Sequence, residues 1–119
     1  MKTNCYKDLI VWQRSLDLVH GIYKITKQLP KSELYSLASQ MQRATVSIPS
    51  NIAEGQSRNH RPEFIQFLHI AYGSTSELET QVLISKKEYP YLDYGSVEKD
   101  LESVQKMLMG LIKSIKAIN

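Results

Sequence analysis

The sequence predicts an all-α protein, an antiparallel up-down-up-down four-helix bundle. Two observations lead to this fold class. Proline and glycine residues divide the 119 residues into four segments of similar length, and these residue types interrupt helices. Each segment carries an apolar stripe at alternating steps of three and four residues, the spacing of one helix face. Segments of this kind joined by short loops are typical of antiparallel bundles.

Composition fits a single folded domain spanning residues 1–119. Hydrophobic residues make up 42% of the chain and charged residues 23%, a balance typical of globular proteins. No apolar run approaches the roughly 18 residues that a membrane-spanning helix needs. We therefore expect a globular bundle without a membrane partner.

The first helix is expected at about residues 7–28 and carries two apolar stripes. We assign the first stripe to the bundle core; it comprises Leu9, Trp12, Leu16, Val19, Tyr23 and Thr26. The second stripe lies about 120° around the helix and comprises Val11, Leu18, Ile22 and Ile25. We predict that this second stripe is an oligomer interface, since exposed apolar patches mark interfaces. The alternative is a compact bundle that buries wide stripes.

The second helix is expected at about residues 32–55, with Gly55 at its end. Its core stripe comprises Leu34, Leu37, Met41, Ala44 and Ile48. Pro49 interrupts the pattern, because proline removes a backbone hydrogen bond and bends a helix. We predict one kinked helix, since Ile52 and Ala53 continue the apolar face; two shorter helices meeting at Pro49 are the alternative.

The third and fourth helices are expected at about residues 62–88 and 96–117. Pro62 and Glu63 suit the first turn of a helix, and Lys113 and Lys116 suit the last. The core stripe of the third helix comprises Phe64, Leu68, Ala71, Thr75, Leu78 and Val82. That of the fourth comprises Val97, Leu101, Val104, Leu108, Leu111, Ile115 and Ile118.

A polar ridge runs beside the apolar stripe of the second helix. Arg43, Ser47, Asn51 and Glu54 share one helix face at steps of four, four and three. Burying an unpaired guanidinium is costly, so we expect Glu77 or Glu79 to neutralise Arg43. The ridge and Glu77 then form a structural polar network that sets the helix register. In the alternative interpretation, Arg43 and Asn51 contact a ligand or nucleic acid.

Basic residues are expected to gather at one end of the bundle. The net charge is +3, and up-down topology brings both termini and the second loop together. The candidate nucleic-acid-binding residues there are Lys2, Lys7, Arg58, His60, Arg61, Lys113 and Lys116. Binding would be directed at phosphates and would weaken with salt. A solvated basic surface without a ligand is the alternative.

Residues for catalysis or metal binding are not grouped in the sequence. His20, His60 and His69 lack metal-ligand spacing, and the glycines are too isolated to form a phosphate loop. We expect no enzyme activity, no cofactor and no metal. The single Cys5 and the polar first residues favour a reducing cytoplasm.

The segment from Arg43 to Gly55, RATVSIPSNIAEG, closely resembles the signature of four-helix-bundle proteins encoded in intervening sequences of bacterial 23S ribosomal RNA genes. The residues from Tyr6 to Gln13 and from Ile70 to Glu79 are similar to the same family, and the resemblance covers about Tyr6 to Ile115. Thr45 and Tyr72 depart from it, since smaller residues are expected there.

The resemblance implies a ring-like homo-oligomer, a homopentamer, and no enzyme. It extends to the accessory protein of diversity-generating retroelements, a basic barrel that associates with a reverse transcriptase and nucleic acid. The function that we expect is binding of nucleic acid, with ribosomal RNA suggested by genetic location. The alternative is a protein–protein interaction adaptor without a nucleic-acid role. Salt dependence separates the two, because phosphate binding weakens steeply as salt rises.

Overall fold

A computed structural model describes residues 5–118, which form four α-helices and two short 3₁₀ helices and contain no strand. The molecule measures 49 × 23 × 20 Å. In chain order the elements are η1 (Tyr6–Asp8), α1 (Ile10–Gln28), η2 (Lys31–Glu33), α2 (Leu37–Ser57), α3 (Arg61–Glu88) and α4 (Gly95–Lys116). The predicted all-α class with four helices is confirmed.

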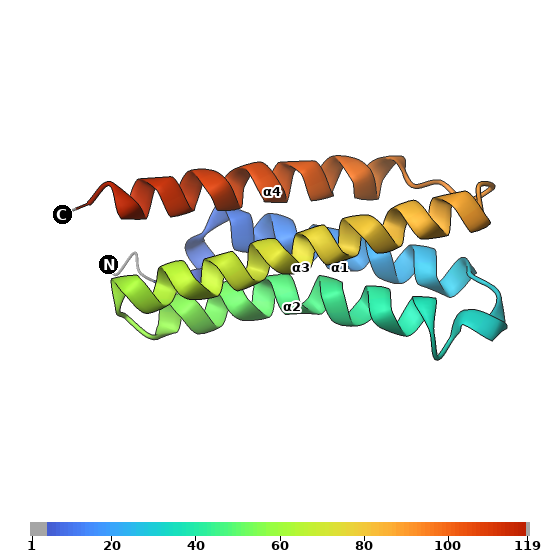
Figure 1. The fold of residues 1–119 in the computed structure, drawn as a ribbon, viewed down its shortest axis with the longest axis horizontal. Coiled ribbons are helices and arrows are strands. Elements are labelled where there is room, and N and C mark those ends of the chain that lie inside the picture. The colour runs from blue at the N-terminus through green and yellow to red at the C-terminus, as the bar shows by residue number, and fades with distance from the viewer. Residues whose placement is uncertain (1–4, 119) are drawn as a thin grey trace.

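The four helices lie side by side along the long axis of the molecule (Figure 1). Each of α2 and α4 packs against both α1 and α3, so the core lies between all four helices. Both termini and the α2–α3 loop lie at one end of the bundle, and the other two loops lie at the opposite end (Figure 1). We call these the termini end and the far end.

Helix α2 runs without interruption through Pro49, as the preferred prediction had it. Its start differs from the prediction, because it begins at Leu37 rather than near residue 32. Lys31–Glu33 form a 3₁₀ turn instead, and Ser36 has non-helical backbone angles of φ −127° and ψ −98°. Leu34 is therefore 53% exposed and does not join the core.

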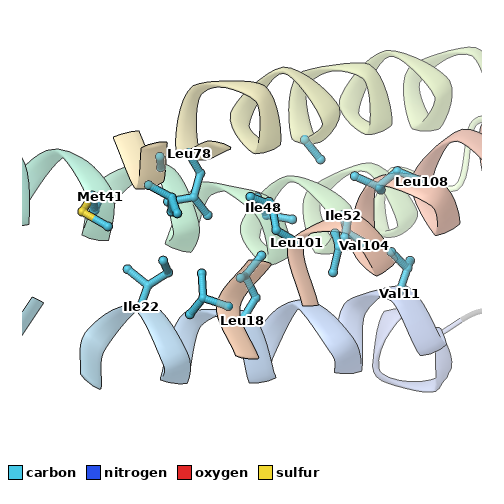
Figure 2. Packing of buried hydrophobic residues seen from close by; sticks show 14 of the residues in the cluster. Val11, Leu18, Ile22, Met41, Ile48, Ile52, Leu78, Leu101, Val104 and Leu108 are labelled. Carbon is cyan, nitrogen blue, oxygen red and sulfur yellow. The ribbon is translucent and has the colours of Figure 1, made fainter. Parts of the chain in front are cut away.

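The second apolar stripe of α1, predicted to be exposed, faces the core. Val11, Leu18, Ile22 and Ile25 are at most 5% exposed within the single chain. Figure 2 shows Val11, Leu18 and Ile22 pointing from α1 into the space shared with the other helices. A face buried inside one chain cannot contact a second chain, so the predicted oligomer interface at these four residues is wrong.

Both stripes are apolar, so packing against the other helices decides which of them is buried. Leu18 and Ile22 are purely aliphatic and pack without a polar atom to satisfy. Ser15 lies on the same stripe and is fully buried, because its hydroxyl donates a 2.6 Å hydrogen bond to the Trp12 carbonyl. Trp12 stays half-buried on the other stripe and Leu16 is 41% exposed. That stripe forms the outer edge of α1, apart from Thr26, which is buried.

The stripes predicted for the other three helices largely match the core. Met41, Ala44 and Ile48 of α2 are buried. On α3 the predicted stripe from Leu68 to Val82 is buried, and Phe64 is half-buried against the core. On α4, Ile112 takes the place predicted for Leu111, and Ile118 is 55% exposed beyond the end of the helix.

A group of hydrogen bonds joins the loops at the far end. The Tyr89 hydroxyl donates to Glu33 Oε2 at 2.5 Å, which ties the end of α3 to η2. The Tyr94 hydroxyl donates to the Tyr89 carbonyl at 3.0 Å and shares a 2.8 Å bond with Ser85 Oγ. The bond to Glu33 raises the pKa of Tyr89 to about 12, and the same bond lowers the pKa of Glu33.

The variant Tyr89→Phe is expected to lower the Tm most between about pH 4.5 and 10, the ordinary pKa values of the two groups. Because the folded pKa of Tyr89 is raised, its contribution is present below pH 10 and lost as pH rises towards 12. Because that of Glu33 is lowered, its contribution is lost as pH falls below 4.5. Thermal unfolding of both proteins across pH measures the difference. A Tm difference that is constant with pH would contradict the hydrogen bond.

Candidate nucleic-acid interface

The described candidates for nucleic-acid binding come from four elements at the termini end (Figure 1). Arg58 is the residue that follows α2, His60 precedes α3 and Arg61 is its first residue. Lys113 and Lys116 lie in the last turn of α4, and Lys7 lies in η1. Lys2, the remaining candidate, lies outside the described residues. The topology thus brings together the basic residues of η1, the α2–α3 loop and α4.

Two of these candidates already contact acids of the same chain. Arg58 contacts Glu54 Oε2 at 3.0 Å and Glu63 Oε1 at 3.2 Å, and its guanidinium lies 5.2 Å from the centre of the Phe67 ring. His60 Nδ1 lies 3.0 Å from the other carboxylate oxygen of Glu63. These contacts hold the α2–α3 loop together, so the Arg58 and His60 side chains are less available to a phosphate.

The other candidates keep their charge available. Arg61 Nη1 donates a 2.6 Å hydrogen bond to the Ile118 carbonyl, which holds the start of α3 beside the end of α4. Lys7, Lys113 and Lys116 are exposed. None of these four cations has an acid within ion-pair distance among residues 5–118. They form a group that we call the free basic cluster.

The α2–α3 loop turns tightly beside this cluster. Asn59 adopts a left-handed backbone conformation with φ 53°, which asparagine tolerates better than most residues. Pro62 follows in the first turn of α3. An open hollow of about 630 Å³ lies at the loop, lined by Gly55, Gln56, Asn59, His60, Arg61, Pro62 and Phe64. The hollow therefore borders the free basic cluster through Arg61.

Gly55 sets how closely α2 and α3 approach at this end. A Cβ atom at Gly55 would lie 2.6 Å from Phe67 Cβ and 3.0 Å from Phe64 Cδ1. Real side chains do not approach so closely, so α3 can pack here only against glycine. This contact sets how α3 leaves the α2–α3 loop, and Arg61 at its start reaches the Ile118 carbonyl at the end of α4.

The polar ridge is only partly a buried network. Ser47 Oγ and Ser74 Oγ share a 2.8 Å hydrogen bond between α2 and α3, and Asn51 Nδ2 donates to the Ser47 carbonyl at 2.8 Å. The Ser47–Ser74 bond bridges the two helices, and Asn51 supports Ser47 from within α2. Glu54 is instead exposed and pairs with Arg58.

The predicted neutralisation of Arg43 by Glu77 or Glu79 is wrong. Arg43 and Glu77 are both exposed, and neither forms an ion pair within residues 5–118. Glu79 accepts a 3.2 Å hydrogen bond from Gln105 of α4. The premise was burial of Arg43, and an exposed guanidinium needs no partner in the same chain.

Two other features are absent from the described part of the chain. It contains no group of three or more His, Cys, Asp or Glu side chains arranged to hold a metal ion. None of the helices between residues 5 and 118 combines the length and apolar character needed to cross a membrane.

Sequence reasoning missed the ion pairs that occupy Arg58, although one signal was present. Glu54 and Arg58 are four residues apart on one helix, the spacing at which opposite charges meet. It also missed that Leu16 of α1 is exposed and borders an apolar hollow. No local signal points to the Glu33–Tyr89 contact, because its residues are 56 positions apart.

Comparisons with known proteins support the sequence resemblance. A solved structure from Bacteroides thetaiotaomicron, described as a protein of unknown function from the S23 ribosomal protein family, is similar with a TM-score of 0.79 and 26% identity. The similarity covers 87% of this chain and 96% of that one. No curated protein matches. The relation to the retroelement accessory protein stays a prediction.

The family comparison covers most of the molecule. The model of the 23S rRNA-intervening sequence protein family matches residues 7–110, which include the α2–α3 loop and all of α1, α2 and α3. This span exceeds half of the 119 residues. The chain belongs to the 23S rRNA-intervening sequence protein family.

Proposed function

We propose that this chain forms a non-catalytic homo-oligomer that binds nucleic acid through its termini end. Ribosomal RNA is the first candidate ligand. The observation that carries the proposal is the free basic cluster of Lys7, Arg61, Lys113 and Lys116. Three elements contribute these cations, and no acid among the described residues pairs with them. Phosphate groups are the natural ligands of such a surface.

Assembly would multiply the effect of a small net charge. We propose an antiparallel up-down-up-down bundle that assembles into a ring-like homo-oligomer, a homopentamer. Each subunit then presents its termini end on the same face of the ring, and the potentials of the repeated clusters add. A net charge of +3 per chain becomes +15 for five chains, five times the value for one.

The proposed contact is to the phosphate backbone rather than to bases. Lysine ammonium groups are point charges that neutralise phosphates without reading sequence. Arg58 and His60 act differently in this proposal, since Glu54 and Glu63 already hold them. Their role is to shape the loop that positions Arg61. The proposed location is the cytoplasm, where Cys5 would stay reduced.

A protein–protein interaction adaptor is the second candidate function. One observation favours it: Leu16 of α1 and Val46 of α2 are 41% and 40% exposed and border the same apolar hollow. Docking of a partner there would be driven by apolar burial and would change little with salt. The proposed binding of phosphates would instead weaken steeply as the salt concentration rises.

The test is the affinity for a structured RNA stem-loop, measured by fluorescence anisotropy between 50 and 300 mM salt. With the four cations of one subunit on phosphates, the logarithm of the binding constant is expected to fall with a slope of about −3 to −4 against the logarithm of salt concentration. Absence of RNA binding at the lowest salt, or binding independent of salt, would overturn the proposal.

A further inference from the structure

An apolar groove lies on the outside of the bundle between α1 and α2. We call it the α1–α2 groove; it has a volume of about 310 Å³, and its apolar walls include Trp12, Leu16, Val19, Val46, Pro49 and Ala53. Leu16 and Val46 are 41% and 40% exposed. The groove therefore presents apolar side chains from two adjacent helices to solvent, which is typical of a docking surface.

A polar hollow continues the groove towards the far end. It measures about 490 Å³, shares Val46 with the α1–α2 groove and includes Arg43 in its wall. Arg43 is exposed and has no acid partner among residues 5–118. A ligand that fits both hollows would combine an apolar surface with one negative charge.

Helix α3 carries a surface with that chemistry. Ile70, Glu77 and Ile84 are spaced by seven residues, or two helical turns, and so form one line along the helix; we call it the α3 stripe. Ile70 and Ile84 are 46% and 48% exposed. Glu77 lies between them, exposed and without a cation partner in the described chain.

Gly73 of α3 adds a second observation. It lies between Ile70 and Glu77 and is exposed, and a Cβ atom there would meet nothing within 4 Å. Glycine inside a helix costs about 1 kcal/mol relative to alanine, and no neighbour in the same chain requires it. Close approach of a backbone from another chain would require glycine at this position.

We propose that the α3 stripe of one copy occupies the α1–α2 groove of the next copy, with Glu77 opposite Arg43. The stripe spans about 21 Å and the α1 wall of the two hollows, from Trp12 to Tyr23, about 16 Å at 1.5 Å per residue, so the hollows accommodate all but about one turn of the stripe. Because the two faces differ, the contact is head-to-tail, and such contacts generate rings when they close. This inference rests on the homo-oligomer proposed above and names its interface.

The decisive experiment mixes two variants that each lose one face. Leu16→Arg removes the groove and Ile84→Arg removes the stripe, and each alone is expected to run as a 13.7 kDa monomer. An equimolar mixture is expected to form a dimer of about 27 kDa, twice the mass of one chain, because one intact groove meets one intact stripe. The control Leu83→Arg changes an exposed leucine outside the stripe and is expected to keep the native mass.

The outcomes distinguish an error in the assigned interface from an error in the proposed homo-oligomer. If the unmodified chain is a monomer, the proposed homo-oligomer itself fails. If the unmodified chain assembles but either variant keeps its native mass, or the mixture gives no dimer, the assigned interface is wrong. Circular dichroism of each variant checks that the bundle is folded, which is expected because both positions are exposed.

Charge reversal tests the assigned register. Arg43→Glu and Glu77→Arg are each expected to weaken association about tenfold or more, since like charges then face each other across the interface. Combining both changes in one chain is expected to restore association, because a reversed groove then meets a reversed stripe at every contact of the ring. Loss of association in both single variants without restoration in the double variant would overturn the Arg43–Glu77 pairing.

Discussion

The variant Leu18→Ala is expected to lower the free energy of unfolding by about 2–5 kcal/mol, the usual cost of a cavity in a well-packed core. Leu18 is 0% exposed and belongs to the stripe of α1 that faces the other three helices. The matched variant Leu16→Ala, two residues away, is expected to change that free energy by no more than about 0.5 kcal/mol. Leu16 is 41% exposed and lies on the outer edge of α1.

Urea unfolding at a concentration that keeps both variants monomeric measures this contrast. The comparison is stringent because the substitution, the helix and the residue type are the same. Equal losses, or a larger loss at Leu16, would mean that α1 is rotated about its axis relative to the structure. The α1–α2 groove would then close, and its assignment as an interface would fail with it.

The double variant Lys113→Glu/Lys116→Glu is expected to weaken RNA binding about tenfold or more and to make the salt slope shallower by about two. Each lysine on a phosphate contributes about one unit to that slope. Both lysines are exposed at the end of α4 and have no acid partner within residues 5–118, so the bundle is expected to fold normally. Anisotropy titrations at several salt concentrations supply both quantities.

The control is Lys87→Glu/Lys99→Glu, which reverses two exposed lysines towards the far end. Both double variants change the net charge from +3 to −1, since each reversal removes two charges. Equal losses in the two proteins would show that only net charge matters and would remove the assignment to the free basic cluster. Arg58→Glu is a poorer probe, because it would place a third carboxylate beside Glu54 and Glu63.

The sequence predicted the number of helices and most of their faces for a simple reason. On α2 and α4 one stripe is clearly the more apolar, so period alone identifies the buried side. Helix α3 also exposes Ile70 and Ile84 outside its core stripe. On α1, the stripes of Leu16 and Leu18 are both regular and apolar, and only packing against the other helices decides between them. Periodicity carries no information on that choice.

The position of the candidate site could be predicted from the sequence, but the pairing of its cations with acids could not. Up-down order alone brings Arg61 to the end of the bundle that holds Lys113 and Lys116, and the Arg61–Ile118 hydrogen bond agrees. The ion pairs of Arg58 with Glu54 and Glu63 depend on side-chain conformations around a tight turn. Those conformations depend on how the helices pack in the folded protein, so they cannot be predicted from the sequence.

The most direct test of the account is the native mass of the unmodified chain, alone and with structured RNA, by light scattering at low and high salt. The account predicts about 69 kDa for five chains of 13.7 kDa. It also predicts that RNA co-elutes at low salt and separates at high salt, while the protein mass stays constant. A 13.7 kDa monomer at every concentration, or an oligomer that never binds RNA, would contradict it.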